Sequence, residues 1–585
     1  MNDCNRAVNK VYDERKDFIL IGLTGRTGSG CSTVSKILGE KEFSKLNLRT
    51  PKSYDFKNSE ERKYSILYGY AETCNWGPFQ VISISDIITS FIIEQGYDAL
   101  KGYIEKLSSP PKKEIVIHDK EVLLKELENL KGDMDKIKNL IIDEDTRESI
   151  ITPVVYQENV HELANKLKEI LKRSNVESEE KQLQLYTFLY QRIGKNLRSS
   201  GNPFNEEFLQ DKFFTVAERT NALIKEMRNA NKREKKPTLI CIDAIRNPFE
   251  ASFFKDRYSA FYLMSVNTDD LSRRKRLDFL KSDEINSLDG IEYPKKLDKK
   301  EKFYNQNIGA CLEIADIHIY NPDIDNNKHY FLTEQLLKYV MLMIHPGLIT
   351  PTHIERCMQV AYNAKLNSGC LSRQVGAVVT DNEYSIKSIG WNEVPRGQVS
   401  CSLRDVREYC KNKDRETYSN YEITNYKFSV AMEDLCGKIK DDDLKGRKYP
   451  YCFKDVYNKL ENKNNQVYTR ALHAEENAFL QISRNGGVGV NGGFLFSTAS
   501  PCELCSKKSY HLGIKRIYYI DPYPGISQSH ILQFGSLDNP ELNLFYGAIG
   551  NAYINLYTPR MPYKDELEML TGWKTKEKIE SIEKE

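Results

Sequence analysis

The chain has 585 residues, too many for one ordinary core, so we expect two to four domains. Its 85 basic and 83 acidic residues leave a net charge of +2, which excludes the strongly positive surface of a generic nucleic-acid-binding protein. The 13 cysteines, the polar N-terminus and the lack of a long apolar run exclude an exported disulfide scaffold and a membrane protein, so we expect a cytoplasmic chain with reduced thiols.

The first predicted elements are an apolar strand and a helix, residues 17–39, around a glycine-rich loop. The loop follows the pattern G-x-x-x-x-G-K-[ST], whose backbone amides cradle phosphate, except that Cys31 replaces the lysine. We predict that it binds a nucleotide, with Ser32 on Mg²⁺, because glycines let backbone approach phosphate closely. Phosphoryl transfer and a loop that binds nothing stay open as alternatives. The predicted nucleotide-binding residues are Gly25, Arg26, Thr27, Gly28, Ser29, Gly30, Cys31, Ser32, Thr33 and Asp243.

Strands continue to alternate with helices through the first half, which predicts a parallel sheet with helices on both faces. Residues 79–95 read as a strand running into a helix, with Asp86 at the strand end. Residues 100–172 are rich in Lys, Glu, Leu and Ile and predict an inserted helical hairpin. A later strand ends at Asp243, where a carboxylate can organise Mg²⁺. Candidates for neutralising phosphate charge are Arg246, Arg274 and Arg276.

A second unit begins near Pro351 with a helix that Thr352 and Glu355 start as a capping box. The order of predicted elements that follows, αββαβαβ, indicates a three-layer α/β/α domain, interrupted by a polar insert at about 397–469. We place the domain boundaries at 1–345 and 346–572. The charged tail, residues 573–585, is expected to be mobile.

The strongest chemical signal is His473-Ala-Glu475 followed by Pro-Cys502-x-x-Cys505. Two thiolates and one imidazole hold Zn²⁺ with three protein ligands and leave the fourth position to water, which is the catalytic arrangement. Glu475 is spare and can carry a proton from water to a substrate. We expect a helix that begins at Ser500, as N-cap, to present both cysteines on one face. This H-x-E…P-C-x-x-C pattern is that of zinc nucleobase deaminases.

A structural zinc site is the alternative for a lone C-x-x-C. A closed site needs a fourth ligand, and no second C-x-x-C lies nearby in the sequence. The cysteines of the insert, which have long and irregular spacings, favour buried free thiols over a second metal. They are Cys401, Cys410, Cys436 and Cys452.

The stretches "SRQVGAVVTD", "GWNEVP", "LHAEENAFL" and "PCELCSKKSYHLGIKRIYYI" together resemble the deoxycytidylate deaminase branch of the cytidine deaminase superfamily. Members of that branch often carry a second, structural zinc in the stretch that corresponds to the insert. The resemblance implies that Asn392 contacts the deoxyribose or phosphate and that the Ala474 backbone reads the pyrimidine edge. It leaves Arg373 open between the phosphate, a neighbouring subunit and a surface salt bridge. The metal ligands and the proton shuttle implied are His473, Cys502, Cys505 and Glu475.

The glycine loop and its strands resemble P-loop nucleotide and dephospho-coenzyme A kinases. The fold class expected is therefore α/β, an N-terminal P-loop NTPase or nucleotide-kinase-like domain with a helical insert, followed by the cytidine deaminase-like domain. This pairing is similar to the deaminase fusions of bacterial antiphage defence, which deplete dCTP. The resemblance implies a zinc-dependent dCTP or dCMP deaminase that is a homo-oligomer and is regulated by a nucleotide or a small RNA at the first domain.

Two other functions remain open at this stage. An RNA or single-stranded DNA cytosine deaminase would need a basic groove with aromatic stacking residues, and the insert mixes Tyr, Lys and Arg with acidic residues. A non-catalytic regulator would keep the deaminase domain as a scaffold, which the complete zinc signature disfavours.

Overall fold

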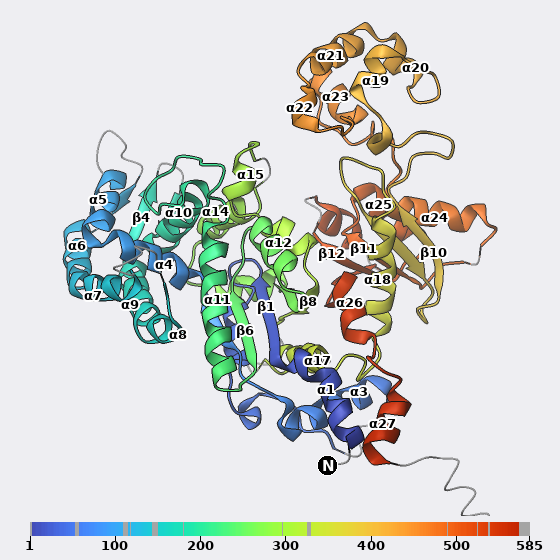
Figure 1. The fold of residues 1–585 in the computed structure, drawn as a ribbon. Helices are drawn as coiled ribbons and strands as arrows, with labels where there is room; N and C mark the ends of the chain where they lie inside the picture. The colour runs from blue at the N-terminus through green and yellow to red at the C-terminus, as the bar shows by residue number, and fades with distance from the viewer. Residues whose placement is uncertain are drawn as a thin grey trace, which may run out of the picture. The chain divides into compact units, whose positions relative to one another are not determined.

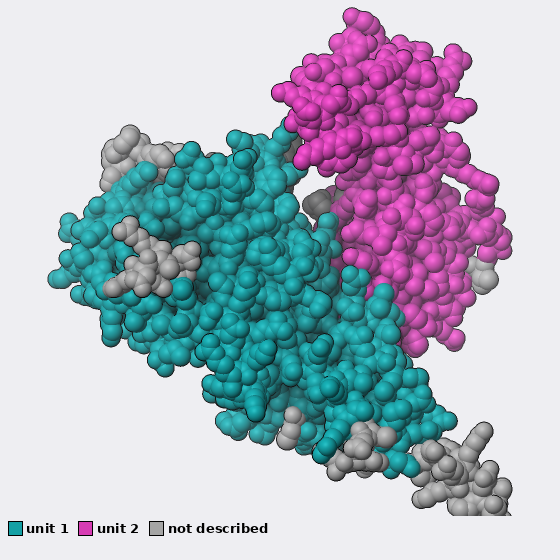
Figure 2. All heavy atoms as spheres, in the orientation of Figure 1, with its two compact units in different colours: residues 1–350, 551–585 teal, residues 351–550 magenta. Residues whose placement is uncertain are grey.

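The computed structural model describes residues 3–52, 58–108, 115–117, 119–142, 150–178, 181–294, 297–323, 329–487, 489–522, 525–535 and 539–572. The chain forms two compact units, residues 1–350 with 551–585 and residues 351–550, which Figure 2 colours separately. The first boundary lies close to the one expected from the sequence. Residues 551–572, which we expected in the second domain, belong instead to the first unit, and the predicted mobile tail lies outside the described residues.

Parallel strands form the central sheet of unit 1, in the order β8-β7-β1-β6-β2 within this unit. Figure 1 labels β8, β1 and β6 of this sheet. Every residue of β1 is buried, as a continuous apolar run between two neighbouring strands requires. Strands β6 and β2 lie on one side of β1, and β7 and β8 lie on the other. Because the strand order reverses direction at β1, the carboxyl end of β1 is a topological switch point. The strands are β1 (Phe18–Thr24), β2 (Gln80–Ser83), β6 (Thr238–Asp243), β7 (Phe261–Asn267) and β8 (Ile317–Tyr320).

Helices pack around this sheet and include the predicted helix after the glycine loop. Asp86 is not at a strand end as expected, because β2 ends at Ser83 and Asp86 lies in the first turn of α4. The helices are α1 (Asp3–Asp17), α2 (Cys31–Leu38), α3 (Ser59–Tyr70), α4 (Ile84–Gln95), α11 (Thr215–Arg233), α12 (Pro248–Arg257), α13 (Asp270–Arg276), α14 (Ser282–Glu292), α15 (Glu301–Tyr304), α16 (Ile308–Glu313) and α17 (Tyr330–Ile344).

The predicted helical insert is present but is more than a hairpin. It contains a small antiparallel sheet of β3 (Val116–Ile117), β4 (Asn175–Ser178) and β5 (Lys181–Gln184). Its apolar residues belong to the same core cluster as those of β1 and β6. Its helices are α5 (Tyr97–Ser108), α6 (Lys120–Glu128), α7 (Lys131–Ile141), α8 (Pro153–Val155), α9 (His161–Arg173) and α10 (Leu185–Ser200), the last ending at the left-handed Gly201.

The last two helices, α26 (Gly550–Tyr557) and α27 (Tyr563–Thr571), account for the difference in the domain boundary. Helix α27 packs on α1 through a buried polar cluster. The Tyr12 hydroxyl donates to Glu566 at 2.9 Å, and His345 Nε2 lies 2.8 Å from the same carboxylate. The rings of Tyr12 and His345 stack at 4.2 Å. These contacts fix the C-terminal helix to unit 1.

Unit 2 is the predicted three-layer domain, with one more strand than the sequence indicated. Its sheet has the order β10-β9-β11-β12-β13, in which β9 pairs antiparallel with β10 and β11 and the remaining pairs are parallel. The elements are α18 (His353–Lys365), β9 (Gly376–Thr380), β10 (Ile386–Trp391), α24 (Ala474–Arg484), β11 (Phe494–Ala499), α25 (Glu503–His511), β12 (Arg516–Asp521) and β13 (Glu541–Leu544). The predicted capping box of Thr352 and Glu355 starts α18.

Two glycines in unit 2 allow helices to approach the sheet closely. A Cβ atom at Gly376 would lie 1.9 Å from the Ala361 carbonyl oxygen of α18. A Cβ atom at Gly390 would lie 2.2 Å from the Ala474 carbonyl oxygen, at the start of α24. Since neither distance tolerates a side chain, Gly376 sets how near α18 lies to β9, and Gly390 sets how near the first turn of α24 lies to β10.

The insert at 397–469 folds as a helical lobe with its own core. Arg404 and Glu422 form a buried ion pair there, both fully inaccessible to solvent, and Arg470 approaches the same carboxylate at 3.1 Å. The helices are α19 (Val406–Lys411), α20 (Asn420–Thr424), α21 (Tyr426–Gly437), α22 (Asp441–Leu444) and α23 (Phe453–Leu460). Across the part of the chain that the structure describes, no helix has the length and hydropathy needed to span a bilayer.

Candidate active site

Three side chains of unit 2 that the sequence singled out come together in one cluster. The ligand atoms of His473, Cys502 and Cys505 all lie within 4.8 Å of one another. His473 Nδ1 is 3.3 Å from the Cys502 sulfur and 3.5 Å from the Cys505 sulfur. A tetrahedral zinc with ordinary bond lengths separates nitrogen and sulfur ligands by about 3.6 Å. The donor set and its spacing therefore fit Zn²⁺, with a fourth position left over.

The electrostatics of the cluster favour a thiolate. Hydrogen bonds from Cys505 and His473 lower the pKa of the Cys502 thiol to about 3, against the opposing effect of burial. The hydrogen bond with Cys502 raises the pKa of His473. Cysteine binds metal as the thiolate, so the lowered pKa favours the metal-binding form of Cys502.

Glu475 lies two residues after His473, in the first turn of α24, and is 4% exposed. Burial raises the pKa of its carboxyl group. The Ser497 hydroxyl of β11 donates to Glu475 Oε1 at 3.1 Å. Sequence reasoning did not select Ser497, although a hydroxyl inside the apolar strand "FLFSTA" is a signal that could have found it. A buried, oriented carboxyl group beside three candidate metal ligands is suited to proton transfer.

The local structure explains how these side chains are presented. His473 is the N-cap of α24, and Cys502 is the N-cap of α25. The capping box expected at Ser500 is therefore wrong, because α25 begins at Glu503. The Glu503 carboxylate instead accepts a hydrogen bond from the Ile526 amide at 2.9 Å. Both ligand-bearing turns are helix starts, where the macrodipole favours anions.

Asn392 and Ala474 are the predicted substrate contacts. Ala474 follows His473 directly in the chain, and Asn392 contacts Leu472, the residue before His473. The side-chain oxygen of Asn392 accepts from the Val375 amide at 2.6 Å, and its nitrogen donates to the Leu472 carbonyl at 3.4 Å. Asn392 thus ties the start of β9 to the residue before His473. Ala474 is fully buried at the first position of α24.

Arg373 pairs with Asp521, the last residue of β12. The sequence left three roles open for Arg373, namely a contact with the substrate phosphate, with a neighbouring subunit or with an acidic side chain in a salt bridge. The contact with Asp521 corresponds to the salt bridge. In the insert, the four cysteines do not assemble with other described residues into a group with metal-ligand geometry; they are Cys401, Cys410, Cys436 and Cys452.

The glycine loop of unit 1 connects β1 to α2 as the sequence predicted. Gly28 and Gly30 have φ angles of 85° and 107°, which favour glycine. A Cβ atom at Gly30 would also lie 2.2 Å from Asn321 Nδ2. At the start of α2, the amides of Cys31 and Ser32 have no acceptor among the described residues, as expected for the first turn of an uncapped helix.

Asp243 lies at the end of β6 beside the loop, as predicted. The Ser35 hydroxyl donates to it at 3.1 Å. Burial raises the pKa of Asp243, opposed by hydrogen bonds from Ser32 and Ser35. Burial also raises the pKa of the Cys31 thiol to about 12, so this residue is neutral at pH 7.

A cavity of about 600 Å³ opens over the loop. Gly25 and Ser29 are buried behind it. The predicted residues that line it are Arg26, Thr27, Gly28, Gly30, Cys31, Ser32, Thr33, Asp243, Arg246 and Arg276. Other lining residues come from the helical insert, among them Lys168 and Tyr186, and the sequence offered no signal for them because they are more than a hundred residues from the loop.

The comparisons with known proteins concern unit 2. Residues 351–521 match the family described as "cytidine and deoxycytidylate deaminase zinc-binding region". The deoxycytidylate deaminase of Enterobacteria phage T2 is 29% identical over 170 residues, which is 28% of this chain and 78% of that protein. The deoxycytidylate deaminase of Schizosaccharomyces pombe is 27% identical over 222 residues, 38% of this chain and 52% of that protein.

Among solved structures, the dCMP deaminase of the cyanophage S-TIM5 in complex with dCMP and dUMP is 22% identical, with a TM-score of 0.20, and the match covers 34% of this chain and 99% of that chain. The family match covers the metal cluster, Glu475 and their supporting strands. Residues 351–521 are therefore a domain of the cytidine and deoxycytidylate deaminase type, which carries the zinc-binding region of that family.

Proposed function

We propose that the chain is a zinc-dependent hydrolase that deaminates deoxycytidine nucleotides, dCMP, dCTP or both, to the deoxyuridine nucleotides. The observation that carries this proposal is the convergence of three metal donors beside a buried carboxyl group. The names of the relatives support the substrate class, since those proteins are deoxycytidylate deaminases.

In the proposed reaction, His473, Cys502 and Cys505 hold the metal, which would act as a Lewis acid on water. Glu475 takes a proton from the attacking water and delivers it to the ring nitrogen of cytosine. The water oxygen bonds to the ring carbon C4 in this step. Glu475 then takes the second proton from that oxygen and passes it to the exocyclic nitrogen, so that the bond from C4 to this nitrogen breaks, ammonia leaves and the C4 carbonyl of the uracil forms. Ser497 holds the carboxyl group in the orientation that these transfers need.

The test is to incubate the zinc-loaded chain with dCMP, dCTP and a cytosine-containing single-stranded oligonucleotide. Chromatography should show dUMP or dUTP with release of ammonia, and the oligonucleotide should remain unchanged. Conversion of the oligonucleotide alone would contradict the proposal and favour a nucleic-acid deaminase. A zinc-loaded chain inert on every cytosine substrate would favour a non-catalytic regulator.

For unit 1 we propose a regulatory nucleotide site at the glycine loop, with a Mg²⁺–nucleotide held by Ser32 and Asp243; a small RNA is the other regulator that the resemblance implies. The cavity over the loop supports the proposal of a bound nucleotide.

We further propose that a homo-oligomer of this chain depletes dCTP in the cytoplasm during phage infection. Light scattering tests the oligomer. Nucleotide pools in infected cells test the depletion, with a Glu475→Gln strain in which dCTP should persist.

A further inference from the structure

The cavity over the glycine loop is lined by four arginines, and each is already held by protein acceptors. Arg26 pairs with Asp289 at 2.9 Å, and Arg246 pairs with Glu292 at 2.5 Å. Arg198 forms a buried ion pair with Glu250. Arg276 donates hydrogen bonds to the backbone carbonyls of Gly28, Ser29 and Asn321. Each of these guanidinium groups thus has at least one protein acceptor, although the Arg26 Nε atom has none among the described residues.

Lys168 is the exception among the cations of this cavity. It extends from α9 of the helical insert, with its amine 5.7 Å from the centre of the Tyr186 ring. No ion pair between Lys168 and an acidic side chain is found among the described residues, whereas its neighbour Lys166 pairs with Asp133 and Glu162. Its charge is one of those that oppose the raised pKa of Asp243, which places it near the strand end beside the loop. A lysine is thus present where the loop itself offers only the neutral thiol of Cys31.

The hydrogen-bond donors of the loop fall into two sets. At the helix end, the amides of Cys31 and Ser32 have no protein acceptor among the described residues. At the strand end, the Thr27 amide and hydroxyl donate to the carboxylate of Glu292 at 3.0 and 2.5 Å. Glu292 is fully buried and also pairs with Arg246. The Thr27 donors therefore already have a carboxylate acceptor, and a negative charge beside them disfavours a further phosphate at this end of the loop.

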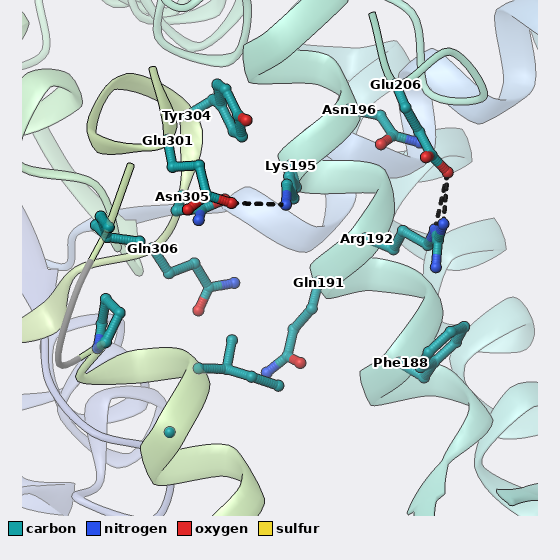
Figure 3. Close-up of a pocket in the computed structure, with 14 residues that line it drawn as sticks. Phe188, Gln191, Arg192, Lys195, Asn196, Glu206, Glu301, Tyr304, Asn305 and Gln306 are labelled. Carbon is teal, nitrogen blue, oxygen red and sulfur yellow. Dashed lines mark hydrogen bonds and ion pairs between the residues drawn. The ribbon is translucent and has the colours of Figure 1, made fainter. Parts of the chain in front are cut away.

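A second cavity, of about 710 Å³, adjoins the first. Gln191 and Gln306 line both cavities and point into the second one from opposite walls (Figure 3). The side-chain oxygen of Gln306 is buried without a hydrogen-bond partner. Phe188 and Tyr304 add aromatic surface, while the charges at the rim are paired as Lys195 with Glu301 and Arg192 with Glu206. Amides and aromatic rings without free charge suit a neutral nucleobase better than a phosphate.

We infer that unit 1 binds a nucleoside diphosphate across the two cavities, with the phosphates between the free loop amides and Lys168 and the base between Gln191 and Gln306. Lys168 then replaces the lysine that the loop lacks, and Glu292 makes the site select a diphosphate over a triphosphate. The inference deepens the proposal of a regulatory nucleotide site and does not depend on the chemistry of unit 2.

The experiment is calorimetric titration of the full zinc-loaded chain, in buffer with Mg²⁺, against inorganic pyrophosphate, ADP, GDP, ATP and GTP. These probes carry no cytosine, so binding at unit 2 and loss of deaminase activity do not enter the result. We expect ADP or GDP to bind more tightly than its triphosphate. Glu292→Gln should narrow or reverse that preference, because it removes the repelling charge and keeps the hydrogen-bonding shape.

Two substitutions separate the phosphate contact from the base contact. Lys168→Ala should weaken pyrophosphate and the preferred diphosphate at least tenfold, since a hydrogen bond to a charged group contributes about 1.5–3 kcal/mol. Lys168→Arg should restore most of this loss. Gln306→Leu should weaken the diphosphate about three- to tenfold and leave pyrophosphate unchanged. The matched control is Lys172→Ala, one turn later on α9, exposed and outside both cavities, which should change no affinity.

Three results would overturn the inference. They are the absence of binding by every probe, unchanged affinities in Lys168→Ala, and tighter binding of the triphosphate by the parent chain. Thermal melting of each variant shows whether a loss of affinity reflects unfolding, and Gln306→Leu removes no hydrogen bond of the described protein, so its melting temperature should hold.

Discussion

Replacing Glu475 by Gln is the sharpest test of the metal centre. The substitution keeps the size of the side chain and the hydrogen bond from Ser497, and it leaves all three metal ligands in place. It removes only the carboxylate that we propose accepts and returns a proton. Because Glu475 is 4% exposed, bulk water cannot readily take over this transfer.

The expected loss follows from what a positioned acid or base contributes. Proton transfer by such a group accelerates a reaction about 10²- to 10⁴-fold, which corresponds to about 3–5 kcal/mol of activation free energy. We expect kcat on dCMP or dCTP to fall by at least a hundredfold under conditions in which the parent chain turns over. Zinc content, measured by atomic spectrometry, should remain one ion per chain.

The matched control is Glu476→Gln, the next residue on α24. Glu476 is partly exposed and pairs with Lys508 at the surface, and such pairs contribute about 0–1 kcal/mol. Its kcat should change less than about threefold, since it takes no part in proton transfer. If Glu475→Gln retains more than a tenth of the parent rate with zinc bound, Glu475 is not the proton shuttle and the mechanism is wrong.

Asn392→Ala should lower the free energy of unfolding by about 1–3 kcal/mol, because the buried Val375 amide loses its acceptor. An unchanged melting curve would mean that the Asn392 side chain contacts substrate only and does not stabilise the fold. Glu422→Gln should cost about 3–5 kcal/mol and expose the 397–469 lobe to limited proteolysis, because the buried Arg404 charge loses its partner. Burial lowers the pKa of His318 to about 3, so the native state holds it neutral while the unfolded chain protonates it below its usual pKa of 6.5. Stability should therefore fall as the pH drops from about 6.5 toward 3, by about 2 kcal/mol at pH 5, and denaturant titrations of His318→Gln should show a correspondingly smaller loss.

Much of the fold could be read from local patterns. The apolar strand of residues 18–24 and the capping box of α18 each depend on neighbouring residues only, and both are confirmed. The predictions that failed concern boundaries between elements. Asp86 lies in a helix, and the N-cap of α25 is Cys502, two residues after the Ser500 that the capping pattern indicated. Caps depend on which side chain reaches which amide, and tertiary contacts such as that of Glu503 with Ile526 decide it.

The sequence by itself singled out the candidate metal site, because His473, Glu475, Cys502 and Cys505 have the types and spacing that zinc chemistry and the start of a helix favour, and the structure brings the three donors together. It also determined the glycine loop, where Gly28 and Gly30 adopt backbone angles that other residues avoid. Only the tertiary structure showed which distant residues lie at the loop. Lys168 of the helical insert lines the cavity over it, and Glu292 of α14 accepts a hydrogen bond from Thr27, and no local pattern records that residues so far apart in the chain come together.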